Sequence, residues 1–197
     1  IDGFRFDQAN LLSSKTAKLI LKELQGINPD VVVYGEAWDN KQTEFSRMSW
    51  GSFNDSFRDI LRGDLHDFSN KGFLFGTYRP TDNINSLKTI IGGSLLSTGG
   101  LYVSSENSIN FLEVHDNYSF SDYLRISLDK NHQNEIINDR LEHIRLTPEI
   151  KKLNTLGALI LFTSQGIPII HQGQEWAHSK IIAPTKVPDP DVGKMDP

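Results

Sequence analysis

The sequence predicts an α/β fold built on a parallel β-sheet, which is either open or closed into a (β/α)8 barrel. Short apolar runs with the character of strands alternate along the chain with amphipathic, helix-like segments, and this alternation is typical of βαβ units. Each strong strand also runs directly into a cluster of polar, aromatic or acidic residues. Both architectures place their sites at the carboxyl ends of parallel strands, so a functional site is expected at that edge of the sheet.

Four short apolar runs have the composition of strands. They lie at residues 3–7, 31–34, 109–114 and 166–170. The run at 31–34 is β-branched up to its final tyrosine, which predicts a strand that is buried on both faces of a parallel sheet. Helices are predicted at residues 14–27, 53–65, 86–91 and 148–163, the first of them capped by a serine.

Composition excludes several classes of function. The chain has 197 residues, a net charge of −5 and no cysteine. It therefore offers no broad basic surface for nucleic acid or anionic lipid, no disulfide and no thiolate metal site. No apolar run approaches the roughly 20 residues needed to span a bilayer. There is also no glycine-rich phosphate loop, which argues against a nucleotide site.

Three carboxylates, at Asp7, Glu36 and Asp116, stand just past predicted strands. Glycoside hydrolysis needs one carboxylate that attacks or activates water and one carboxylic acid that protonates the leaving oxygen. It requires no nucleotide, thiol or metal cofactor. The three carboxylates at strand ends therefore fit carbohydrate hydrolysis.

Each carboxylate has a neighbouring residue that can influence its ionisation or contribute to sugar binding. Arg5 stands two residues before Asp7, so in a strand it points to the same face and can hold Asp7 ionised. Trp38 lies two residues beyond Glu36, where an apolar wall would favour the protonated group that a general acid needs. His115 precedes Asp116 and can donate a hydrogen bond to a sugar hydroxyl.

Structural explanations compete with these functional ones. An Asp after a strand is common, because Asp favours turns and helix caps. Four further histidines stand in no cluster along the sequence, so surface or packing roles are expected for them: His66, His132, His143 and His178. No H-E-x-x-H or H-x-H spacing occurs, and no metal site is predicted.

Taken together, the clusters resemble four motifs of the α-amylase clan of glycoside hydrolases, in the order of that family. The four are Gly3-Phe4-Arg5-Phe6-Asp7, Gly35-Glu36-Ala37-Trp38, Val114-His115-Asp116-Asn117, and the segment from Gly166 to Glu175. The resemblance implies that Asp7 is the nucleophile, that Glu36 is the general acid/base and that Asp116 stabilises the transition state. It further implies substrate-binding roles for Arg5, Trp38, His115 and Asn117.

Within the clan the details are similar to type I pullulanases. The segment from Ser52 to Gly63 resembles their strand-six region, which reads F-N-D-x-x-R-D-x-x-x-G. Four positions depart from the pullulanase pattern: Gln8-Ala9 replaces Leu-Met, Ala37 replaces Gly, and Val114 replaces Lys. The resemblance implies hydrolysis of α-1,6 branch linkages in pullulan, glycogen or branched maltodextrin. An isoamylase-like or α-1,4-specific enzyme of the clan remains an alternative, as does a non-catalytic carbohydrate-binding relative.

The resemblance also implies the domain organisation. Residues 1–197 are expected to be one partial catalytic (β/α)8 TIM-barrel domain, covering roughly strands four to eight with their helices. Strands one to three and a C-terminal β-sandwich are expected to lie outside the sequence, and the isolated chain is expected to be inactive. Some clan members bind calcium, but no EF-hand loop is present to indicate it here. The expected partner is an α-glucan, and neither a nucleic acid nor a membrane.

Overall fold

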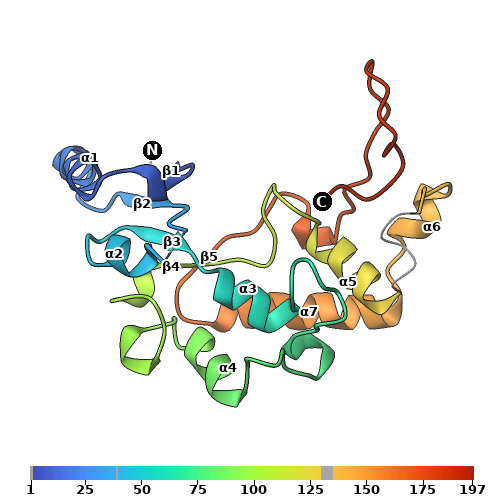
Figure 1. Ribbon diagram of the computed structural model, residues 1–197, viewed down its shortest axis with the longest axis horizontal. Helices are drawn as coiled ribbons and strands as arrows, with labels where there is room; N and C mark the ends of the chain where they lie inside the picture. The colour runs from blue at the N-terminus through green and yellow to red at the C-terminus, as the bar shows by residue number, and fades with distance from the viewer. Residues whose placement is uncertain (1, 39, 130–134) are drawn as a thin grey trace. The chain divides into compact units, whose positions relative to one another are not determined.

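The computed structural model describes residues 2–38, 40–129 and 135–197 (Figure 1). His132 lies outside the described residues. The chain divides into two compact units. The first unit comprises Ile1–Phe57, Ile84–Phe111 and Thr163–Ile169, and the second comprises Arg58–Asn83, Leu112–Phe162 and Ile170–Pro197. Among the described residues, no helix has the length and apolar character needed to cross a membrane.

The first unit contains a parallel sheet of five short strands that follow one another in chain order. The strands are β1 (Gly3–Phe6), β2 (Val32–Gly35), β3 (Gly51–Phe53), β4 (Ser108–Asn110) and β5 (Ile167–Pro168). All four pairings are parallel, for example Phe4 with Val33 and Ser52 with Ser108. Neighbouring strands that run parallel and in sequence order form the curled sheet of a half-barrel. The predicted parallel α/β sheet is confirmed, whereas its numbering as strands four to eight stays a prediction.

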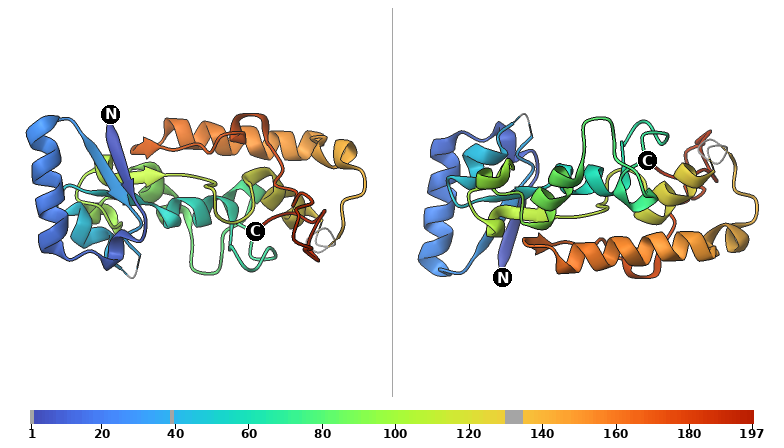
Figure 2. Two further views of the ribbon diagram at one scale, coloured as in Figure 1. Left: turned by 90° about the horizontal axis from the view of Figure 1, so that it is seen from above. Right: turned by 90° about the horizontal axis from the view of Figure 1, so that it is seen from below.

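Two α-helices of the first unit lie close to the positions expected from sequence, and a third, at residues 42–46, was not predicted. Its α-helices are α1 (Ser14–Ile27), α2 (Gln42–Ser46) and α4 (Ile84–Ile91), with short 3-10 helices at Ala9–Leu11, Leu96–Thr98 and Ser105–Asn107. Ser13 caps α1 by accepting a hydrogen bond from the backbone N–H of Thr16 at 3.1 Å. Figure 2 shows α1 beside β1 and β2.

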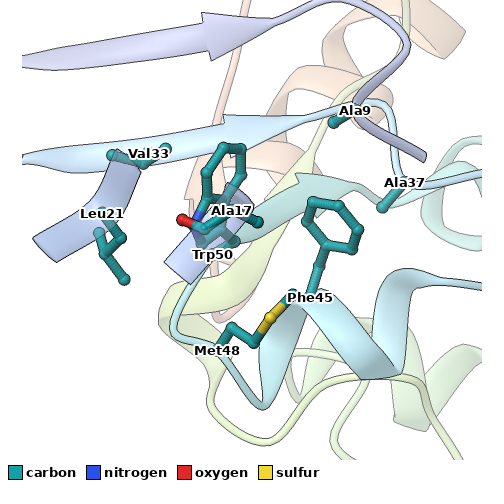
Figure 3. Close-up of a cluster of buried hydrophobic side chains, with 8 residues drawn as sticks. All are labelled: Ala9, Ala17, Leu21, Val33, Ala37, Phe45, Met48 and Trp50. Atoms are coloured by element: carbon teal, nitrogen blue, oxygen red, sulfur yellow. The ribbon is translucent and has the colours of Figure 1, made fainter. Parts of the chain in front are cut away.

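The packing of α1 depends on Trp50, which has no exposed surface. Its indole N–H donates to the carbonyl of Ala17 in α1 at 3.2 Å, and its ring packs on Phe6 and Phe45. Figure 3 shows the apolar side chains gathered around it, which are Ala9, Ala17, Leu21, Val33, Ala37, Phe45 and Met48. This cluster fixes α1 and α2 to the outer face of β1 and β2.

The sheet also contains a buried polar network centred on Asn54, which directly follows β3. Its amide nitrogen donates to the hydroxyls of Ser94 and Ser108 and to the side-chain oxygen of Asn110, at 2.8, 2.9 and 3.2 Å. Its amide oxygen accepts the backbone N–H of Phe57 at 3.0 Å and so caps α3 (Asp55–Arg62). One side chain thus joins β3 to β4 and starts the next helix.

Three helices of the second unit are α5 (Phe120–Leu128), α6 (Arg140–Ile144) and α7 (Pro148–Thr163), the last of which ends within the first unit. Short 3-10 helices lie at Phe73–Phe75 and Gln174–Trp176. Helices α5 and α7 meet at Gly157, where a Cβ would come within 2.8 Å of the Phe120 ring. Glycine is therefore required for this close approach.

The second unit buries the whole side chain of a charged residue, Arg62. The Arg62 side chain is enclosed, donates to the carbonyl of Leu112 at 3.0 Å, and lies over the Tyr123 ring at 4.6 Å. Burial lowers the pKa of Arg62 to about 10, so it remains charged at neutral pH.

The structure corrects two expectations about individual elements. The helix predicted at 53–65 begins only at Asp55, because Phe53 ends strand β3 and Asn54 is the capping residue. The predicted strand at 31–34 was expected to be buried on both faces, but Val32 is exposed. Side chains alternate along a strand, so Val33 enters the Trp50 cluster and Val32 faces the other side of the sheet.

Asp122 in α5 is the most enclosed carboxylate of the second unit, with no exposed side-chain surface. It accepts hydrogen bonds from Arg125 at 3.0 Å and from the backbone N–H of Lys180 at 2.7 Å. His143 lies 3.6 Å away, so this histidine packs against a buried carboxylate. Burial alone would raise the pKa of Asp122, but the nearby polar groups of His143 and Ser179, the hydrogen bond from the backbone N–H of Lys180 and the charge of Arg125 together hold it below its ordinary value.

We expect Asn54→Ala to lower the free energy of unfolding by about 2–4 kcal/mol, because buried partners lose their hydrogen bonds and α3 loses its cap. Asn138→Ala, at an exposed asparagine, is the matched control and should change this value by less than about 0.5 kcal/mol. Denaturant unfolding of the protein at its natural length measures both. Equal stability of the two variants would contradict the structural role of Asn54.

We expect Asp122→Asn to lower the free energy of unfolding by about 3–5 kcal/mol at pH 7, because Arg125 keeps a buried charge without its carboxylate. The pKa of Asp122 is lower in the folded state than in the unfolded chain, so its stabilising effect is full above the unfolded value of about 4. The effect declines as the pH falls below that value. Unfolding curves between pH 7 and pH 3 should therefore show the gap to wild type closing at the acid end.

The control for this second prediction is Asp30→Asn, which changes an exposed aspartate. It should remain within about 0.5 kcal/mol of wild type at neutral pH. A gap between Asp122→Asn and wild type that stays constant down to pH 3 would show that the charge of Asp122 is not what stabilises the fold.

Candidate active site at the strand ends

One guanidinium group joins the two carboxylates that follow β1 and β2. Arg5 donates to Asp7 at 2.8 Å and to Glu36 at 2.6 Å. The structure thus brings together three of the residues predicted from sequence. The expected ion pair between Arg5 and Asp7 is confirmed.

The strand register explains this arrangement. Arg5 and Asp7 are two residues apart, so their side chains leave the same face of β1. Phe6 pairs with Gly35, which places Glu36 at the end of β2 beside the end of β1. A Cβ on Gly35 would lie 2.6 Å from the carbonyl oxygen of Phe6 and 2.7 Å from Ala9, so only glycine allows this approach.

Glu36 also fixes the chain that leaves β1. Its second carboxylate oxygen accepts the backbone N–H of Gln8 at 2.8 Å, and its carbonyl accepts the N–H of Asn10 at 2.9 Å. Gln8 has the left-handed backbone angles φ 42° and ψ 45°, which turn the chain sharply after Asp7. The Glu36 side chain is only 11% exposed, whereas that of Asp7 is 68% exposed.

Two hydrogen bonds hold the Glu36 carboxylate. It accepts one from the guanidinium of Arg5 and one from the backbone N–H of Gln8. The Trp38 ring, expected to form an apolar wall at Glu36, stacks on Phe53 at a centroid distance of 6.4 Å and an angle of 16°.

Two aromatic residues that sequence reasoning missed lie around Arg5. Phe53 packs against Tyr34 edge-on, and the guanidinium of Arg5 lies 5.9 Å from the Phe53 ring. Burial raises the pKa of the Tyr34 phenol, while the charge of Arg5 acts in the opposite sense. The phenol is therefore protonated at neutral pH and can donate a hydrogen bond. Phe53 and Tyr34 looked like ordinary core residues because their role arises from pairing between strands.

The other predicted residues, His115, Asp116 and Asn117, form a group of their own in the second unit. The ring of His115 lies 3.4 Å from the carboxylate of Asp116, and both side chains are exposed. Asn117 has a positive φ of 63°, and Lys180 donates to the carbonyls of His115 and Asn117 at 2.9 and 2.7 Å. Lys180 thus holds both ends of a tight turn that presents Asp116 to solvent.

A third group was not predicted. The buried carboxylate of Glu113 lies 3.1 Å from His171 and 2.8 Å from His178. His178, for which a surface or packing role was expected, therefore belongs to a cluster that forms only in the folded chain. No sequence spacing could indicate this group, because 58 and 65 residues separate the carboxylate from the two rings.

Comparisons with known proteins place this geometry in context. No protein-family model matches the chain. Its sequence is 29% identical to the pullulanase of Bacillus subtilis strain 168 over 196 residues, and 28% identical to pullulanase A of Streptococcus pneumoniae over 193 residues. Each match covers 91% of this chain but only 24% and 14% of those proteins, so the chain spans less than a quarter of their length.

Solved structures give the same result. The pullulanase of Paenibacillus barengoltzii, in complex with maltohexaose and α-cyclodextrin, matches with a TM-score of 0.74 at 29% identity, over 91% of this chain and 27% of that one. The pullulanase of Anoxybacillus sp. LM18-11, in complex with maltotetraose, matches with a TM-score of 0.69 at 28% identity, over 91% of this chain and 25% of that one. Over 91% of its length the chain is therefore homologous to pullulanases in sequence and in fold, which confirms the family resemblance carried by its motifs.

Proposed function

We propose that the protein containing this chain is a retaining glycoside hydrolase of α-glucans, and that it cleaves the α-1,6 branch linkages of pullulan, glycogen or branched maltodextrin. Homology to pullulanases over 91% of the chain supports the class of enzyme and of substrate. The observation that carries the proposal is the bridge formed by Arg5 between Asp7 and Glu36.

This bridge supports a retaining mechanism on geometric grounds. Retaining glycosidases hold their two carboxyl groups about 5–5.5 Å apart, because one attacks the sugar directly. Inverting enzymes need a wider gap that admits a water molecule. Asp7 and Glu36 bind the same guanidinium group and therefore lie near each other, which supports the retaining mechanism as our proposal.

The three acids take distinct roles in the proposed reaction. An oxygen of Asp7 attacks the anomeric carbon while Glu36 gives its proton to the departing glycosidic oxygen, which leaves a glycosyl ester on Asp7. Glu36 then removes a proton from water, and that water releases the sugar and restores both carboxyl groups. Asp116 stabilises the positive charge that develops on the sugar ring. Its role rests on the resemblance of its motif.

The exposures of the two acids agree with this division of roles. A nucleophile must reach the substrate, and the Asp7 side chain is open to solvent and oriented by its ion pair with Arg5. A residue that exchanges a proton twice benefits from a fixed position, and Glu36 is held by hydrogen bonds to both of its carboxylate oxygens. Arg5, Trp38, His115 and Asn117 are the proposed sugar-binding residues.

The first test is an assay of the protein at its natural length. We expect it to release maltotriose from pullulan, with retention of the anomeric configuration, and to act weakly on unbranched amylose. Chromatography of the products and NMR of the first anomer formed provide the two measurements. Cleavage of amylose with pullulan left intact would identify an α-1,4-glucanase instead, and binding without any cleavage would identify a non-catalytic relative.

The second test removes the acids one at a time. Glu36→Gln should lower kcat about 10²–10⁴-fold on pullulan and much less on an aryl glycoside whose leaving group needs no proton. Asp7→Asn should lower the rate at least as far on both substrates, because the covalent step is lost. Asp116→Asn should cost about 10²–10³-fold, because a charge directed at the transition state is removed.

Asp30→Asn is the matched control for these variants, since it changes an exposed aspartate elsewhere in the same unit. Its kcat and KM should equal those of wild type. Turnover near the wild-type rate in Asp7→Asn would refute the assignment of the nucleophile. Equal losses on both substrates in Glu36→Gln would refute its role as proton donor.

A further inference from the structure

We propose that Glu113, His171 and His178 form a binding site for a divalent transition-metal ion, with Zn²⁺ as the best match. The three potential ligand atoms lie within 4.8 Å of one another. His171 Nδ1 and His178 Nε2 approach the same carboxylate oxygen, Oε1, at 3.1 and 2.8 Å. Two imidazoles and one carboxylate are a ligand set that Zn²⁺ accepts, with its fourth position left to water.

The local structure holds all three side chains on the same side. Both histidines belong to one short segment after β5, closed by the 3-10 helix Gln174–Trp176. Gln174 donates its backbone N–H to the carbonyl of His171 at 2.9 Å, and its side chain accepts the N–H of His171 at 3.3 Å. His178 donates its N–H to the carbonyl of Gly173 at 3.1 Å. The two rings are thus fixed before any ion binds.

Gly173 provides the space for the second ring. Its φ of +102° is a conformation that other residues rarely adopt. A Cβ at this position would lie 2.5 Å from Nδ1 of His178. Any larger residue would push the His178 ring away from Glu113.

The carboxylate is oriented as a ligand should be. The Glu113 side chain is 1% exposed, and its other oxygen accepts the backbone N–H of Phe120 at 2.5 Å, so Oε1 is directed at the two rings. Such outer contacts fix metal ligands and strengthen binding. The rings themselves are 29% and 21% exposed, which gives an ion a route to the site from solvent.

Charge in the site is compatible with a dication. Without an ion, each ring can donate a hydrogen bond to the carboxylate in the matching tautomer. To bind an ion, Nδ1 of His171 and Nε2 of His178 would each present a lone pair, and each ring can carry a proton on its other nitrogen. The ion would then replace two hydrogen bonds with two coordinate bonds.

The ion would tie together two segments of the second unit. Glu113 follows β4 and is two residues from His115, whereas the histidines follow β5 and lead into Lys180. Lys180 already holds the turn that carries Asp116. Bound Zn²⁺ should therefore rigidify this turn and raise the temperature of unfolding.

The test is a Zn²⁺ titration of chelator-treated protein at its natural length, followed by calorimetry and by thermal unfolding. We expect one Zn²⁺ per chain and a rise in Tm with metal concentration. His178→Gln keeps an N–H that can donate to Glu113 but provides no imidazole, so its Zn²⁺ affinity should fall by roughly 100-fold or more, since changes outside the ligand shell alone cost about 10–100-fold. His66→Gln, at an exposed histidine of the same unit, should bind as wild type does.

A spectroscopic measurement keeps the proposal testable if His178→Gln folds poorly. Co²⁺ bound to the wild-type protein should show the visible bands of a site with nitrogen and oxygen ligands in a four-coordinate geometry. Absence of stoichiometric Zn²⁺ binding, or binding that is equal in His178→Gln and His66→Gln, would overturn the proposal. Neither result bears on pullulan hydrolysis by Asp7 and Glu36, which is measured separately.

Discussion

The first unit depends on a buried amide that satisfies the polar groups of a very short sheet. Strands β3 and β4 have three residues each, too few for backbone pairing alone to fix their register. Asn54 supplies the missing specificity, because its two side-chain groups bond β4, the loop at Ser94 and the start of α3 at once. Each of these partners is enclosed, and a buried polar group without a hydrogen bond is costly. A shifted register would leave several such groups unsatisfied.

The candidate active site follows from that register. When β1 and β2 pair as they do, residues just past the two strands become neighbours although 31 positions separate Arg5 from Glu36. The backbone of the first turn then bonds to Glu36, so the acid is held by the same contacts that end the strand. The hydrogen bonds that close the turn after β1 thus also position the residues of the proposed reaction, because they leave Asp7 exposed beside Arg5.

In the second unit, buried carboxylates join distant segments in the way that the Asn54 amide does in the first. Glu113 is a shared acceptor for two rings and one backbone N–H, and Asp122 is a shared acceptor for Arg125 and the chain at Lys180. Both carboxylates are buried. Glu113, which precedes α5, and Asp122, within α5, each bind residues of the segment that follows β5. The turn at Asp116 therefore rests on buried ionic contacts, although its own side chains face solvent.

The sequence by itself determined the class of fold, the approximate positions of β1, β2, β4 and β5 but not of β3, the helices α1 and α7, and the pairing of Arg5 with Asp7. These depend on local spacing: apolar periodicity, a capping serine, and the two-residue repeat of a strand. The motifs also predicted the relationship to pullulanases. Helices α2, α5 and α6 were missed, because they are short or, in α5, buried on every side and so lack a one-sided apolar pattern.

Only the tertiary structure decided which distant groups meet. Nothing in the spacing of Glu113, His171 and His178 indicates a cluster, and the stacking of Trp38 on Phe53 depends on how β2 and β3 pair. Contacts of this kind depend on strand order, register and burial, which arise only when the whole chain packs. A local pattern can thus identify a carboxylate at the end of a strand, but the partners that set its charge and orientation come from other strands.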